Sequence, residues 1–152
     1  MCNNNGSDGN CIAELLKVIL VLQQNVCPEN GLDSCDRPML GGGGNCLICN
    51  TRPVMLYMCC GNGVPLSMPT SKDARQVCSN PSLGSSCPDC SNVFRVEKIE
   101  GNCCTFRVLT ANPDESCCNS QPWIATNSFF TMNLDCCCIV RCLNDCYVDC
   151  VC

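Results

Sequence analysis

The 152-residue chain contains no histidine, few aromatic side chains (5%) and only nine lysines and arginines. Without histidine, the base that usually activates a nucleophilic cysteine is missing, which excludes catalysis by a cysteine–histidine pair. The nine basic residues are scattered and are outnumbered by 14 acidic ones, which gives a formal net charge of −5. This charge pattern lacks the electrostatic footprint of a nucleic-acid-binding protein.

The chain also lacks an apolar run long enough to cross a bilayer. The most apolar stretch, residues 12–22, is interrupted by Glu14 and Lys17. It falls short of the roughly 20 residues that a membrane-spanning helix needs. No lysine or arginine precedes it, and no small-residue cleavage site follows it, so it is not typical of an export signal. We therefore expect no membrane insertion and no signal peptide.

Cysteine, by contrast, occupies 22 positions. This is above the roughly 8–10% that is typical of a disulfide scaffold in a short chain. A chain of about 150 residues can bury about 68–70% of its unfolded surface and can fold without such bridges. The surplus of thiols therefore indicates a further purpose, and we favour covalent bonding of one chain to the next.

The hydrophobic pattern predicts a mainly β fold. Residues 11–24 are apolar almost all round and follow two candidate N-caps, Asp8 and Asn10. A helix of this kind is expected to be buried against the body or against a neighbouring subunit. Five later segments have the composition of strands: 54–60, 93–99, 103–109, 129–134 and 136–143. Residues 100–102, between the second and third of them, are typical of a hairpin turn. The pattern favours an antiparallel β-sandwich with one N-terminal α-helix and Cys-rich terminal arms.

We divide the chain into four parts on this basis. They are a flexible arm (1–10), a helix with a Gly-rich linker (11–44), a β-sandwich core (45–143) and a Cys-rich C-terminal tail (144–152). Cysteines recur every four residues from Cys138 to Cys150, which places a row of sulfurs on a segment expected to be exposed.

Alternation along the strands separates inward from outward thiols. The apolar face of residues 103–109 places Cys104 in the core and Cys103 on the surface. The same alternation along residues 130–138 predicts that Cys136 and Cys138 point inward and that Cys137 points outward. Our candidates for intermolecular disulfides are Cys2, Cys103, Cys137, Cys146, Cys150 and Cys152. Our candidates for buried or intramolecular cysteines are Cys104, Cys136 and Cys138.

Other uses of the thiols stay open. Two C-x-x-C pairs, Cys46/Cys49 and Cys87/Cys90, could together supply four thiolates to zinc, although the 37 residues between them exceed the usual spacing. The second pair could also be a redox motif, but a Ser/Gly/Pro loop precedes it and a strand follows. The sulfurs could instead serve packing and internal bridges, as in a secreted disulfide-rich binding module. We find no catalytic constellation and expect neither an enzyme nor a cofactor.

Four segments, taken in order, resemble one known family. They are residues 50–57 (NTRPVMLY), 93–97 (VFRVE), 103–109 (CCTFRVL) and 132–143 (MNLDCCCIVRCL). These segments resemble the spore coat proteins CotY and CotZ and the exosporium protein ExsY. The resemblance covers about residues 46–143, and the helix expected at 11–24 lies where the family has one.

The resemblance implies a structural protein of the outer spore layer, in the coat, its crust or the exosporium. Such proteins are made in the mother-cell cytoplasm and self-assemble into two-dimensional hexagonal lattices locked by intermolecular disulfides. The implied partners are further copies of the chain, in hexamers within the lattice, and other coat or exosporium proteins. The implied function is a protective, semi-permeable barrier. The alternative from the residues alone is a thiolate (zinc) metal-binding protein.

Overall fold

The computed structural model of the protein describes residues 9–26, 49–73, 90–113 and 121–151. Helix α1 spans Cys11–Gln24, as the sequence predicts, and begins after Asn10, whose side chain accepts a hydrogen bond from the Ile12 backbone N (3.0 Å). One face of α1 is buried against the sheet: Ala13, Leu16, Ile19 and Gln23. Among the described residues, no helix has the length and apolar character needed to cross a membrane.

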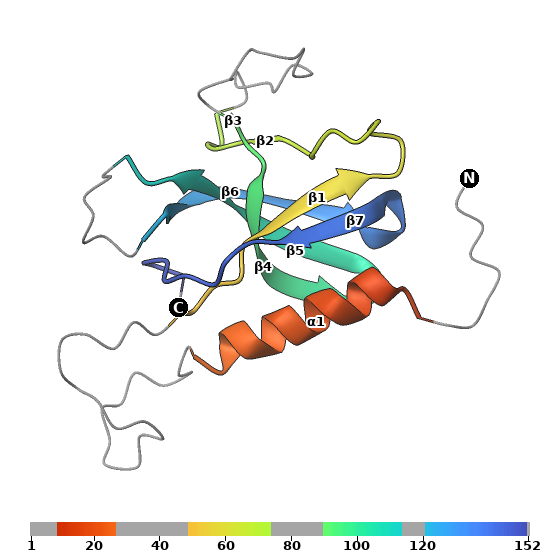
Figure 1. Cartoon of the computed structure of the whole chain (residues 1–152), viewed down its shortest axis with the longest axis horizontal. Helices are drawn as coiled ribbons and strands as arrows, with labels where there is room; N and C mark the ends of the chain where they lie inside the picture. Colours follow the sequence, from red (N-terminus) through yellow and green to blue (C-terminus); the bar gives the residue numbers. More distant parts are fainter. Residues whose placement is uncertain (1–8, 27–48, 74–89, 114–120, 152) are drawn as a thin grey trace.

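A five-stranded antiparallel sheet forms the body, with strand order β6-β5-β4-β1-β7 (Figure 1). The strands are β1 (Val54–Met58), β4 (Val93–Glu100), β5 (Cys103–Ala111), β6 (Trp123–Asn133) and β7 (Cys137–Cys142). A second, two-stranded sheet consists of β2 (Met68–Pro69) and β3 (Cys90–Ser91). The predicted fold class, mainly β and antiparallel with one N-terminal helix, is confirmed.

The predicted hairpin between β4 and β5 is also confirmed. Glu100 pairs with Cys103 across a two-residue turn, and Gly101 in that turn has a φ of +59°, a backbone conformation that favours glycine. The sequence prediction placed the start of β6 too late, because the strand begins at Trp123 and continues to Asn133.

Both faces of the sheet are covered. Successive residues of a strand point to opposite faces, so Val93 and Phe94 belong to different packing clusters. Phe94 packs on the face that α1 covers, where its ring contacts that of Phe130 (centroids 4.8 Å apart). Val93 packs on the other face against Val148 of the C-terminal segment. The sheet therefore lies between α1 and the last residues that the structure describes.

The C-terminal segment is docked on the body. Cys146 pairs with Thr51 in an antiparallel bridge. The Asn50 side chain donates to the Val148 carbonyl (2.8 Å) and accepts from the Val148 backbone N (2.9 Å), as a neighbouring strand would. Val148 is fully buried. The expectation of an exposed row of tail thiols is therefore wrong for Cys146, because Asn50 and Thr51 bind this segment through contacts that are distant in sequence.

The chain between β6 and β7 departs from simple alternation. A 3-10 turn, η1, spans Leu134–Cys136, and the β1–β7 register shifts so that Tyr57 pairs with Ile139 and Met58 with Cys137. Cys138 is thus an extra residue, a bulge, and both irregularities change which side chains point inward. Cys137 is buried and Cys136 is exposed. The predictions for these two residues are wrong because they treated the turn as continuous strand.

Candidate crosslinking site: two groups of exposed thiols

Ten free cysteines lie in the part of the chain that the structure describes. Seven of them are exposed: Cys11, Cys49, Cys60, Cys103, Cys136, Cys142 and Cys150. The other three are buried: Cys104, Cys137 and Cys146. The exposed thiols are the ones that a neighbouring molecule can reach.

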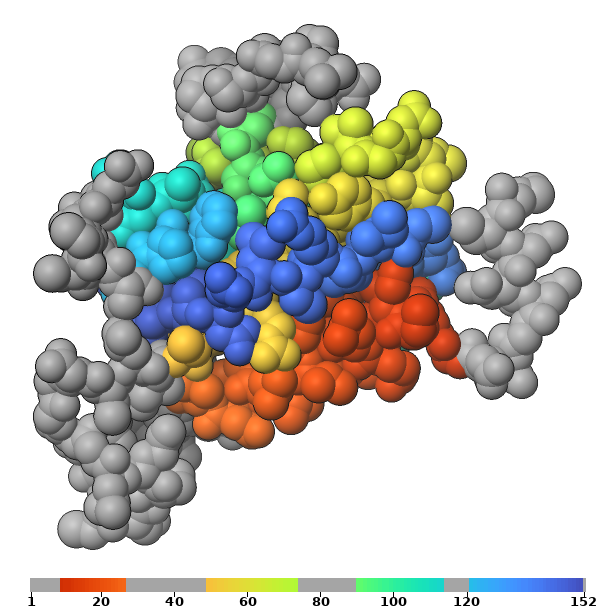
Figure 2. Space-filling view, viewed as in Figure 1, coloured from red at the N-terminus to blue at the C-terminus, as the bar shows by residue number. Residues whose placement is uncertain are grey.

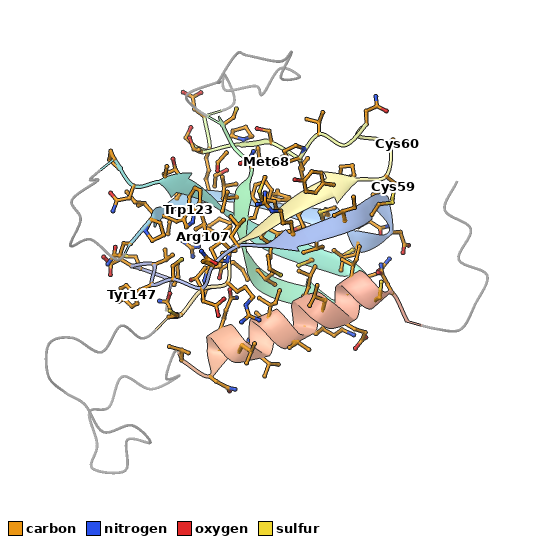
Figure 3. All side chains as sticks on the ribbon, viewed as in Figure 1. Cys59, Cys60, Met68, Arg107, Trp123 and Tyr147 are labelled. Atoms are coloured by element: carbon orange, nitrogen blue, oxygen red, sulfur yellow. A yellow bond between two sulfur atoms is a disulfide. The ribbon has the colours of Figure 1, made fainter. Side chains whose placement is uncertain are left out.

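Four exposed thiols lie at the end of the sheet at which α1 starts. Asn102, next to Cys103 in sequence, accepts a hydrogen bond from the Asn10 side chain (3.4 Å), and its carbonyl accepts one from the Leu134 backbone N (2.9 Å). The Cys59 backbone N donates to the carbonyl of Cys136 (3.0 Å). Figure 3 shows Cys59 and Cys60 side by side beyond the end of β1. These contacts bring together what we call the helix-start thiols: Cys11, Cys60, Cys103 and Cys136.

The other three exposed thiols lie around the end of α1. Gln23 accepts a hydrogen bond from the Arg52 backbone N (3.2 Å), which ties the last turn of α1 to the segment before β1. The contacts of Asn50 with Val148, and the pairing of Val54 with Cys142, bring the end of β7 and the C-terminal segment to the same place. We call the three the helix-end thiols: Cys49, Cys142 and Cys150.

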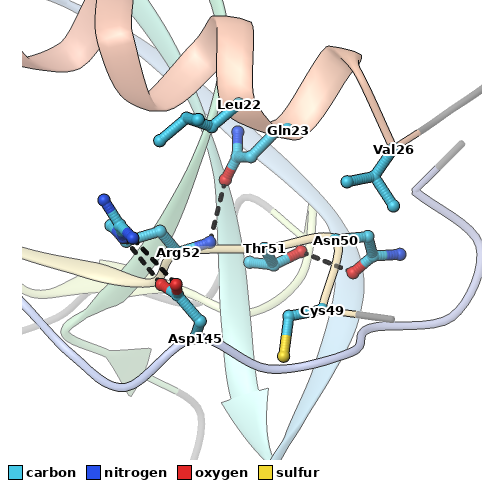
Figure 4. Close-up of a pocket in the computed structure, with 8 residues that line it drawn as sticks. All are labelled: Leu22, Gln23, Val26, Cys49, Asn50, Thr51, Arg52 and Asp145. Atoms are coloured by element: carbon cyan, nitrogen blue, oxygen red, sulfur yellow. Dashed lines mark hydrogen bonds and ion pairs between the residues drawn. The ribbon is translucent and has the colours of Figure 1, made fainter. Parts of the chain in front are cut away.

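A hollow of about 210 Å³ lies between the end of α1, residues 49–52 and the C-terminal segment (Figure 4). Its lining residues are Leu22, Gln23, Val26, Cys49, Asn50, Thr51, Arg52 and Asp145. Arg52 donates two hydrogen bonds to the Asp145 carboxylate (2.7 and 2.8 Å), which lower the pKa of Asp145. This ion pair joins the C-terminal segment to the body beside the Cys49 thiol.

The two groups of thiols are too far apart to bond within one chain. α1 has 14 residues, so at about 1.5 Å per residue its two ends lie roughly 21 Å apart. Strand β7 runs from Cys137 to Cys142, so at about 3.3 Å per residue it places Cys136 and Cys142 roughly 20 Å apart as well. A disulfide requires Cα atoms within about 7 Å of each other. A disulfide between a helix-start thiol and a helix-end thiol therefore has to join two copies of the chain.

The three buried thiols are poor nucleophiles. Burial raises the pKa of Cys104 to about 12, and it also raises the pKa of Cys137. Burial, with smaller contributions from the nearby Cys49 and Asp145, raises the pKa of Cys146 to about 11. Because the thiolate is the reactive form, these cysteines remain protonated packing residues near neutral pH.

One disulfide joins strands of the sheet within the chain. Cys59, after β1, is bonded to Cys138 of β7, with Cα atoms 4.9 Å apart and a sequence separation of 79 positions. The sequence interpretation placed Cys138 among the buried or intramolecular cysteines and made no prediction for Cys59. The bond fixes the bulged start of β7 to the end of β1.

The six predicted crosslinking residues differ in their exposure, and two of them lie outside the described residues. Cys103 and Cys150 are exposed and free, as predicted. Cys137 and Cys146 are buried, so their prediction as outward thiols is wrong. Cys2 and Cys152 lie outside the described residues. The interpretation also missed five exposed thiols: Cys11, Cys49, Cys60, Cys136 and Cys142. Of these, Cys60 lies just beyond the end of β1 and Cys142 is the last residue of β7. A position at a strand end could have indicated that these two thiols are exposed.

A buried polar network supports Asn50 and Thr51, the residues that bind the C-terminal segment. Arg95 of β4 is 4% exposed and donates to the Thr51 hydroxyl (2.9 Å) and to the Asn50 carbonyl (3.2 Å). It also forms an ion pair with Glu97 (3.1 Å), which Arg107 contacts in turn (2.8 Å). Arg95 thus holds the backbone that binds the C-terminal segment.

The zinc interpretation depends on thiols that the structure describes only in part. Cys46 and Cys87 lie outside the described residues, and Cys49 is a free, exposed thiol. Across residues 9–26, 49–73, 90–113 and 121–151, no three Cys, Asp or Glu side chains are grouped so as to hold a metal ion.

Comparison with known proteins identifies the family. The family model described as spore coat protein Z matches residues 1–124, which include α1 and strands β1 to β5. No curated protein and no solved structure matches the chain. The family match covers well over half of the sequence, includes three of the four segments that indicated the resemblance, and confirms the family. The chain belongs to the spore coat protein Z family.

Proposed function

We propose that the protein is a structural subunit of the outer spore layer that assembles into a two-dimensional hexagonal lattice held by intermolecular disulfides. Membership of a spore coat family supports a structural role at the spore surface. The lattice would be a protective, semi-permeable barrier in the coat, its crust or the exosporium. Its partners are further copies of the chain, in hexamers, and other spore-surface proteins.

The observation that carries the proposal is the position of the exposed thiols at two ends of a folded subunit. A helix-start thiol and a helix-end thiol bond only between copies, because α1 separates them. When two thiols form a disulfide they release two protons and two electrons, which molecular oxygen or a small disulfide accepts. Neighbours already held in an assembly present their thiols at high effective concentration, which favours bonds between neighbours.

The proposal is tested on the purified full-length chain after air oxidation. We expect electron micrographs to show ordered sheets, and non-reducing gels to show species larger than the monomer that reductant converts to monomer. Serine replacement of the helix-end thiols Cys49, Cys142 and Cys150 should leave the fold intact, because all three are exposed. It should make the assemblies dissolve in denaturant without reductant.

The matched control is the double variant Cys59→Ser/Cys138→Ser. It also removes thiols, but they form a bond within the chain, so its assemblies should remain resistant to denaturant. If the oxidised wild-type chain runs as a monomer and forms no sheets, the proposed function is wrong.

A further inference from the structure

The outer face of α1 carries exposed apolar side chains. Four of its side chains are among the most exposed large apolar residues of the structure: Leu15 (41%), Val18 (56%), Val21 (53%) and Leu22 (47%). In Figure 2, α1 forms a continuous red-to-orange band along one side of the molecule. A face of this kind on a soluble subunit is typical of a surface that binds another protein.

The exposed residues follow the spacing of a helix–helix contact. Cys11, Leu15, Val18 and Leu22 are separated by four, three and four positions, which places them on one stripe of the helix. This is the heptad spacing at which two helices pack side by side. The stripe begins with an exposed free thiol and continues with three exposed apolar side chains. We call these four residues the outer stripe.

We propose that the outer stripe packs against the outer stripe of a second copy of the chain, with the two helices antiparallel about a two-fold axis. The inference rests on the proposed function and specifies one contact of that assembly. In this pairing Leu15 lies opposite the partner's Val18, and Cys11 lies opposite the partner's Leu22. The interface is isologous, so each such contact occurs twice.

Two features favour a second copy in this orientation. Antiparallel packing places the positive N-terminal end of each helix dipole beside the negative C-terminal end of the other, whereas parallel packing would bring like ends together. The charges beside the stripe are already paired, because Lys17 contacts Glu14 (2.9 Å). Two copies therefore bring no unpaired charge from α1 into the contact.

The same orientation matches the distribution of thiols. In an antiparallel pair, the helix-start thiols of one copy lie at the end where the partner carries its helix-end thiols. These are the two groups that cannot bond within one chain. A second copy is thus the partner that supplies both an apolar stripe and thiols at the required end.

The size of the stripe indicates a weak contact. A helix of roughly 21 Å presents much less surface than the about 800 Å² per partner that is typical of a stable complex. Copies would therefore bind and release through α1 until the lattice is ordered. Disulfides between the facing thiol groups would then make the contact permanent.

Crosslinking through an introduced thiol tests the orientation. In the full-length Leu22→Cys variant, oxidised with a glutathione disulfide, we expect a disulfide between Cys11 and position 22, identified by mass spectrometry of digested protein. Positions 11 and 22 of one helix are about 16 Å apart, so this bond can form only between copies. The matched control is Gln24→Cys, which is exposed but lies away from the outer stripe.

We expect roughly tenfold or more crosslinking to Cys11 in the Leu22→Cys variant than in the control, because docking raises the effective concentration of facing thiols. Equal yields from the two variants would overturn the proposal. A dominant bond between Cys11 and the partner's Cys11 would overturn it in favour of a parallel pair.

A charge placed in the stripe gives an independent test. Val18→Glu should abolish ordered sheets, whereas Ile139→Glu, at a residue of β7 with similar exposure (53%), should keep them. Circular dichroism should show both variants folded, because both side chains are exposed. If the Val18→Glu variant forms wild-type sheets, the α1 contact is wrong and the proposed function stands. If the wild type itself forms no sheets, the proposed function fails.

Discussion

The adjacent cysteines of β5 provide a direct test of how the fold distributes its thiols. Cys103 is exposed and Cys104 is fully buried. We predict that iodoacetamide modifies Cys103 of the reduced, folded protein and leaves Cys104 unmodified. Because the two residues are neighbours in one strand, each is the control for the other.

The magnitude of the difference follows from the pKa of Cys104. Burial raises this pKa from 9.0 to about 12, which lowers the thiolate fraction about a thousandfold at any pH well below 9. Exclusion of the reagent from the core adds to this protection. Because the pKa of Cys104 is raised, its thiolate fraction grows with pH over the whole range below that pKa. The reaction of Cys104 should therefore accelerate about tenfold for each pH unit until the pH approaches its raised pKa.

Mass spectrometry with fragmentation measures both rates, since trypsin releases the two cysteines together in the peptide that ends at Arg107. In concentrated urea the two should react at similar rates. If Cys104 of the folded protein reacted within tenfold of Cys103, the inward orientation of Cys104 and the reasoning from alternation would be refuted. The same experiment distinguishes two readings of residues 136–138. The structure predicts a reactive Cys136 and a protected Cys137, and uninterrupted alternation predicts the reverse.

Two further predictions concern stability. The Cys59→Ser/Cys138→Ser variant should lower the free energy of unfolding by about 4–5 kcal/mol, because the bond closes a loop with a sequence separation of 79. Urea titration should show the loss, and reductant should remove the difference from wild type. Arg95→Met should lower the free energy of unfolding by about 2–3 kcal/mol because it leaves buried hydrogen-bond partners unsatisfied. Lys98→Met breaks an exposed ion pair of the same strand and should change the free energy of unfolding by less than about 1 kcal/mol. Equal effects of these two substitutions would contradict the role given to Arg95.

Local patterns in the sequence predicted the elements that local interactions determine. Helix α1 occupies the predicted residues because an N-cap and a run of apolar residues suffice to define it. The β4–β5 hairpin is similarly defined by its two-residue turn, with glycine at the position that needs a positive φ. Along the uninterrupted start of β5, alternation placed Cys103 and Cys104 correctly.

The sequence failed where contacts distant along the chain decide the outcome. Cys137 is buried because a 3-10 turn and a bulge precede the regular part of β7, and neither has a strong local signal. Cys146 is buried because Asn50 and Thr51, almost a hundred positions earlier, bind the segment around it. The gathering of exposed thiols at the two ends of α1 also depends on the sheet topology, which no spacing of cysteines reveals.

The cysteines of this subunit therefore differ in chemistry according to their place in the fold. Buried thiols such as Cys104 stay protonated and inert, so they can serve as small apolar packing residues while the surroundings become oxidising. The Cys59–Cys138 bond holds two strands within the subunit. Among the described cysteines, the exposed thiols at the two ends are then the ones available to react. A chain rich in cysteine can in this way fold first and be crosslinked later. Under the proposed function, oxidation after assembly strengthens the contacts between subunits and leaves the core unchanged.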